Sequence, residues 1–189
     1  CIKLTKIITY WIVLDSKLIE MRKRAQQIFE KAIESTDVRC LYIEAMAQQH
    51  PSTNITGSWE LVFATKAENE SLEFGAFCNR ALRLICIDET VSDEEALSSF
   101  IFELTNAASS QRFGQLYNLA INGKISREEY AKTKEAIEHE GSLRHCFIML
   151  KAIEQLGWYS SFATEYFDRM DFETVWPLTQ NSRHTEAYR

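Results

Sequence analysis

The chain has few of the residues that interrupt regular structure, with two prolines and six glycines among its 189 residues. Long disordered linkers and β folds with many turns both need more of them, so the composition favours helices. Hydrophobic residues make up 46% of the chain and charged residues 25%, which is an ordinary globular balance. The length fits one domain that spans residues 1–189.

Basic charge is also scarce, since the net charge is −6. Nucleic-acid binders usually carry a basic face, so no nucleic-acid partner is expected. The densest basic run is Met21-Arg22-Lys23-Arg24, in a helical pattern that also holds Glu20 and Glu30. We interpret it as a solvated helix face, with a contact to phosphate or to an acidic partner as the alternative.

Motifs for metals, nucleotides and redox chemistry are missing. The five cysteines are scattered without any CxxC pair, and the chain has no glycine-rich phosphate loop. We therefore predict no cofactor and no metal site. The cysteines stand mostly in apolar contexts, which indicates reduced, buried thiols in a reducing, cytoplasmic compartment. A metal held by His139 and His145 with neighbouring glutamates is a weaker alternative, because the histidines are six residues apart.

No apolar run is long enough to span a bilayer, which needs about 20 residues. The longest near the start is residues 7–14 (IITYWIVL), rich in β-branched and aromatic residues. It reads as a buried strand, with a membrane or signal remnant as the alternative.

The first half of the chain then alternates between helical and extended patterns. Residues 17–34 predict a helix that begins at Asp15 or Ser16, and residues 38–49 a second helix capped by Asp37. After a loop at residues 51–57, residues 58–65 read as a strand. Residues 74–88 hold strand-like runs that break near Asn79-Arg80. Together they predict a hairpin or a three-stranded antiparallel meander over residues 58–88.

The second half is helical throughout. Ser92 and Ser126 each begin a capping box, and residues 111–121 form a helix between them. Gly141 and Gly157 are expected to end the next two helices. The final ten residues are expected to fray.

The predicted architecture is therefore α+β and mainly helical, with a small antiparallel sheet packed by a C-terminal helical layer. Within one domain, residues 1–50 would form an N-terminal helical segment and residues 51–91 a β-meander. Residues 92–189 would form the helical layer, with an aromatic-rich C-terminal part.

The helix expected over residues 92–108 carries a candidate site. Ser99, Glu103 and Asn106 lie three to four residues apart and form a narrow polar strip between apolar stripes. A carboxylate buried there would have a raised pKa, as catalytic carboxylates often do. Alternatively the strip faces water and Glu103 is an ordinary surface acid.

Residues 81–108, a strand ending in ICID followed by EALSSFIFELTNA, resemble the active-site region of bacterial effector or toxin-type zinc metallopeptidases. In the HExxH motif of that family, two histidines bind zinc and the glutamate activates water. Only Glu103 and Ala107 match the motif. Phe102 and Asn106 stand at the ligand positions, and neither replaces imidazole. The resemblance implies a zincin-like scaffold that binds no metal.

These observations predict a non-catalytic protein-interaction module of effector, toxin-associated or regulatory type. A bacterial protein secreted into a host cell would meet the same reducing compartment. The alternatives are a hydrolase of peptidase type that uses Glu103 as acid or base with unassigned partners, and a protein that contacts a membrane through residues 7–14. The residues expected to bind a protein partner are Ser99, Asn106, Phe162, Tyr166, Phe167 and Trp176.

Overall fold

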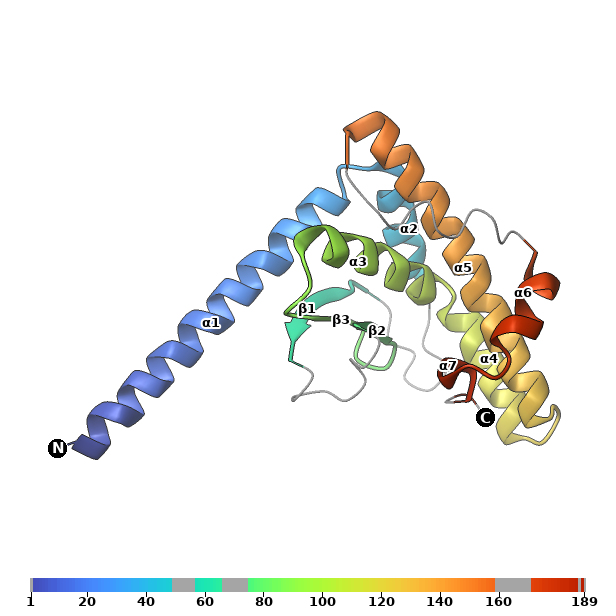
Figure 1. Cartoon of the computed structure of the whole chain (residues 1–189), viewed down its shortest axis with the longest axis horizontal. Helices are drawn as coiled ribbons and strands as arrows, with labels where there is room; N and C mark the ends of the chain where they lie inside the picture. Colours follow the sequence, from blue (N-terminus) through green and yellow to red (C-terminus); the bar gives the residue numbers. More distant parts are fainter. Residues whose placement is uncertain (1, 49–56, 66–74, 159–170, 187, 189) are drawn as a thin grey trace.

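The computed structural model describes residues 2–48, 57–65, 75–158, 171–186 and 188. These residues are mainly helical and include a small three-stranded sheet (Figure 1), which confirms the mainly helical α+β fold. The elements in chain order are α1 (Ile2–Ala32), α2 (Thr36–Ala47), β1 (Glu60–Ala64), β2 (Ala76–Asn79), β3 (Leu84–Asp88), α3 (Asp93–Ala108), α4 (Ser110–Ile121), α5 (Arg127–Leu156), α6 (Phe172–Thr179) and α7 (Arg183–Glu186).

The sheet has the order β1-β3-β2 and is mixed. The hairpin between β2 and β3 is confirmed, but β1 pairs with β3 in parallel, so the antiparallel meander is wrong. The run Ile85-Cys86-Ile87 is buried at every position. A continuous apolar run suits a central strand covered on both faces, which places β3 between the other two. Patterns of hydrophobicity give the strand but not its direction.

The N-terminal segment is one helix, so the prediction of a strand at residues 7–14 is wrong. Neither proline nor glycine interrupts residues 2–32, and a helix once formed propagates through residues of modest propensity. The second half of α1 packs on β1 and α3, whereas its first half projects away from the body (Figure 1). In the part of the chain that the structure describes, no helix is both long and apolar enough to cross a membrane.

The short helix α2 is held at both ends by side chains. Ser35, not Asp37, is its N-cap, and its hydroxyl accepts a hydrogen bond from the Val38 N–H at 3.4 Å. The buried Arg83 guanidinium caps the other end. It donates to the carbonyls of Ala45 (3.0 Å), Met46 (3.1 Å), Gln48 (3.0 Å) and Gly57 (2.6 Å). These contacts satisfy carbonyls that the helix leaves unpaired and tie α2 to the start of β3.

The helix α3 covers one face of the sheet. It begins with the predicted capping box, in which the Ser92 hydroxyl accepts from the Glu95 N–H and the Glu95 carboxylate accepts from the Ser92 N–H. Its apolar residues Leu97, Phe100, Ile101 and Leu104 share one core with Ile85 and Ile87 of β3. The predicted packing of this helix against the sheet is thus confirmed.

The helix α5 runs through Gly141, so the expected helix end at this glycine is wrong. A Cβ atom at Gly141 would lie 2.6 Å from the Thr105 Oγ1 atom of α3. The glycine therefore allows two helices to approach closely rather than ending one of them. Gly157 does end the helix, in the left-handed conformation with φ of 66°.

The C-terminus is ordered against α5, so the expected fraying is wrong for the residues described. Thr185 is fully buried, and its hydroxyl donates to the Glu135 carboxylate at 2.6 Å. The Tyr188 hydroxyl donates to the Glu138 carboxylate at 2.8 Å. These polar contacts give the short α7 a fixed place that an apolar pattern does not predict.

Candidate functional site

The polar strip of α3 turns inward. Glu103 and Asn106 are each 6% exposed, and Ser99 is half-buried. The interpretation of Glu103 as a surface acid is therefore wrong. The Asn106 amide donates to a Glu103 carboxylate oxygen at 3.0 Å, while its own carbonyl oxygen is buried without a hydrogen-bond partner among the described residues.

The charge of Glu103 acts on two thiols of the sheet, Cys78 and Cys86. Burial raises the pKa of the Cys78 thiol, the Arg80 guanidinium opposes this, and the Glu103 charge adds to it. Burial and Glu103 raise the pKa of Cys86 in the same way. Both thiols are held protonated, and a thiol in that state is a poor nucleophile.

Sequence reasoning missed a buried contact between Ser98 and His145. The Ser98 hydroxyl lies 3.0 Å from the Nε2 atom of His145, and both residues are buried between α3 and α5. Burial lowers the pKa of His145 to about 4, against a smaller opposing effect of its bond with Ser98. A base with such a low pKa is poorly matched to activating a serine near neutral pH. We read the pair as a polar link inside the core.

No metal cluster accompanies these groups. Among the residues that the structure describes, no three His, Cys, Asp or Glu side chains lie close enough together to hold an ion. Phe102 stacks edge-on against His145, with 5.9 Å between ring centroids, so one of the two positions equivalent to zinc ligands is occupied by core packing.

The expected aromatic binding surface is only partly described. Phe162, Tyr166 and Phe167 lie outside the described residues. Trp176 is 8% exposed and packs against Phe172, so it is not part of an open surface.

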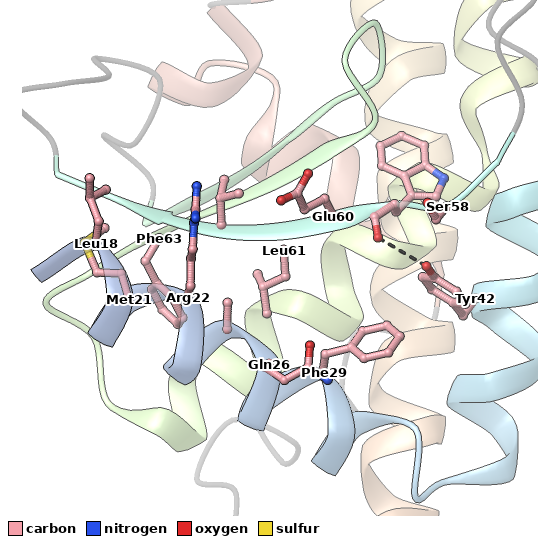
Figure 2. A pocket seen from close by; sticks show the side chains of 13 residues that line it. Leu18, Met21, Arg22, Gln26, Phe29, Tyr42, Ser58, Glu60, Leu61 and Phe63 are labelled. Carbon is pink, nitrogen blue, oxygen red and sulfur yellow. Dashed lines mark hydrogen bonds between the residues drawn. The ribbon is translucent and has the colours of Figure 1, made fainter. Parts of the chain in front are cut away.

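The structure instead shows an open groove of about 650 Å³ between α1 and β1. Its α1 side carries a stripe of residues at helical spacing, and its other side is formed by residues 60–63 of β1 and the two residues before them (Figure 2). Leu61 and Phe63 point from β1 toward α1, while Glu60 points away. The lining residues are Leu18, Met21, Arg22, Ala25, Gln26, Phe29, Tyr42 and residues 58–63.

The backbone of β1 offers hydrogen bonds at this groove. β1 is an edge strand, and its even-numbered residues bond to β3, as the Glu60 N–H does to the Arg83 carbonyl at 3.0 Å. The Glu89 N–H continues this pattern by donating to the Ala64 carbonyl at 3.1 Å. Because bonding alternates along a strand, the N–H and C=O groups of Leu61 and Phe63 point to the opposite edge, where no strand pairs with β1 among the residues that the structure describes.

One cation stands on the groove. Arg22 is exposed, and in the described chain it forms no ion pair. By contrast Arg24, on the same helix, donates to the Asp93 carboxylate at 2.7 Å and to the Glu89 carbonyl at 2.7 Å. Arg24 therefore fixes α1 to the body, and Arg22 leaves a positive charge beside the edge strand.

Comparison of the chain with models of known protein families, with curated proteins and with solved structures finds no match. The resemblance of residues 81–108 to zinc metallopeptidases therefore stays a prediction.

Proposed function

We propose that the protein is a non-catalytic interaction module that binds an extended segment of a partner protein along β1. The observation that supports this most strongly is the pairing of a free strand edge with an apolar groove. The backbone groups of Leu61 and Phe63 would pair with the segment, and alternate side chains of the segment would enter the groove beside α1. Backbone bonds would give affinity and the groove would give selectivity.

The charge on the groove selects the kind of segment. Arg22 favours an acidic side chain at one end of the bound strand. A second copy of the chain pairing through its own β1 offers Glu60, but the Glu60 side chain points away from α1 (Figure 2). The proposed occupant is therefore a partner segment with apolar residues at every second position and an acidic residue beside them.

Selection from a random peptide library against the immobilised full chain tests this function. Enriched peptides should alternate apolar and polar residues and carry an acidic end. The substitution Leu18→Glu changes a residue that lines the groove. It should lower the affinity for a selected peptide at least about tenfold, because a charge would replace an apolar contact. Ile19→Glu is the matched control, since Ile19 is 66% exposed and does not line the groove.

Two results would overturn the proposal. One is a selection that yields no alternating peptide. The other is equal affinity of the Leu18→Glu and Ile19→Glu variants for the selected peptide. Circular dichroism checks that both variants keep the helical content of the wild type.

A further inference from the structure

The first half of α1 has a different character from the rest of the molecule. Residues 2–14 include nine apolar or aromatic residues, two lysines and no acid. Figure 1 shows this half of the helix projecting from the body, while the half that packs on β1 and α3 lies further along. A helical segment of this composition favours an apolar environment.

The apolar residues surround the helix rather than forming one stripe. At 100° per residue, Leu4, Ile7 and Trp11 share one face, whereas Ile12 and Val13 lie on other faces. A second copy packed as a coiled coil would cover only one stripe. A helix that is apolar all round is typical of burial in lipid or in a large core.

Charge along α1 favours lipid. The helix carries seven Lys or Arg residues and three Asp or Glu residues, a net charge of +4. The chain total of −6 leaves −10 for the rest of the molecule. Basic residues beside an apolar helical segment are typical of contact with anionic headgroups, and Lys3 and Lys6 stand in that position.

We propose that residues 2–14 insert into the surface of an anionic bilayer and that Lys3 and Lys6 contact the lipid headgroups. The groove between α1 and β1 would then lie close to the membrane, facing segments of membrane-associated partners.

Flotation of the full chain with lipid vesicles tests this proposal. The probes are vesicles of phosphatidylcholine alone and vesicles with about 30% phosphatidylserine. The wild type should float with the anionic vesicles and should partition less onto the neutral ones. The double variant Ile8→Glu/Ile12→Glu should partition onto the anionic vesicles at least about tenfold less than the wild type, because each carboxylate would have to enter hydrocarbon.

A second variant separates charge from apolar insertion. In the variant Lys3→Gln/Lys6→Gln, partitioning onto anionic vesicles should fall about fivefold for each lysine removed, and partitioning onto neutral vesicles should change little. Ile43→Glu is the matched control, because Ile43 is 60% exposed on α2 and should bind as the wild type does. Unchanged melting temperatures show that the variants are folded.

The proposal fails if the wild type does not float with anionic vesicles, or if Ile8→Glu/Ile12→Glu floats as well as the wild type does. Sedimentation gives a further contrary outcome. If the wild type does not bind vesicles but forms a dimer, and the Ile8→Glu/Ile12→Glu variant is a monomer, the segment would instead contact a second copy of the chain. Peptide binding at the groove is measured in solution, so the two proposals stand or fall separately.

Discussion

The Arg24 guanidinium lies over the ring of Phe63, 4.3 Å from the ring centroid, and so joins α1 to β1. The same guanidinium binds Asp93 and the carbonyls of Glu89 and Val91. One side chain thus fixes the helix against the edge strand and against the turn before α3.

Arg24→Gln should lower the free energy of unfolding by about 2 kcal/mol, because several charge-assisted hydrogen bonds and a cation–π contact disappear together. Chemical denaturation measures this loss. Arg22→Gln is the control with the same change of charge in the same helical turn, and it should stay within about 0.5 kcal/mol of the wild type. Equal losses in the two variants would mean that α1 is not held by Arg24.

Gly141→Ala should destabilise the protein by about 1–3 kcal/mol, although alanine is the better helix former. The added Cβ would lie 2.6 Å from the Thr105 Oγ1 atom, so α3 or α5 must shift. Thermal unfolding measures the loss. The double variant Thr105→Ala/Gly141→Ala removes the clashing oxygen and should be more stable than the sum of the single losses predicts. Strict additivity would contradict a contact between these helices.

Arg83→Lys should lower the free energy of unfolding by about 2–3 kcal/mol. A lysine keeps the charge but cannot bind all four carbonyls at once, so carbonyls at the end of α2 and at Gly57 lose the donor that Arg83 supplies. Arg39→Lys is the matched control, since Arg39 also donates to helix-end carbonyls but is exposed. Urea titration compares the two variants, and a similar small loss in both would argue against the cap.

His145 should make the fold sensitive to acid. Its folded pKa of about 4 lies below the ordinary value of 6.5, so the unfolded chain binds the proton first as pH falls. The contribution to stability is complete above pH 6.5 and is lost toward pH 4, by about 3 kcal/mol.

The measurement is the difference in free energy of unfolding between pH 7.5 and pH 4.5 for the wild type and for His145→Gln. The variant should lose about 2–3 kcal/mol less than the wild type over this range. Identical pH profiles would show that His145 is not held neutral in the core.

Local signals predicted the local structure well. The two capping boxes, the hairpin break at Asn79 and the helix end at Gly157 all follow from the properties of neighbouring residues, and the structure confirms them. The prediction of a helix end at Gly141 was wrong because a glycine in a helical pattern can either end the helix or allow a neighbouring helix to approach closely. Only the contact with Thr105 decides between the two.

The sites depend on contacts between distant parts of the chain. The polar strip on α3 pointed to Glu103, but its burial became visible only with the sheet in place. Ser98 and His145 are 47 residues apart and carry no shared pattern. For the groove, the helical spacing of Leu18, Met21, Ala25 and Phe29 is a usable signal, yet its partner strand lies beyond α2.

The most direct test of strand addition uses the selected peptide itself, with backbone N-methyl groups at either its odd or its even positions. The free edge of β1 presents hydrogen-bonding groups at Leu61 and Phe63 only, so one set of peptide N–H groups should face the protein and the other set water. Calorimetry should show one methylated set losing binding at least about tenfold while the other binds as the parent does. Equal losses in both sets, or none in either, would contradict binding of an extended segment at this edge.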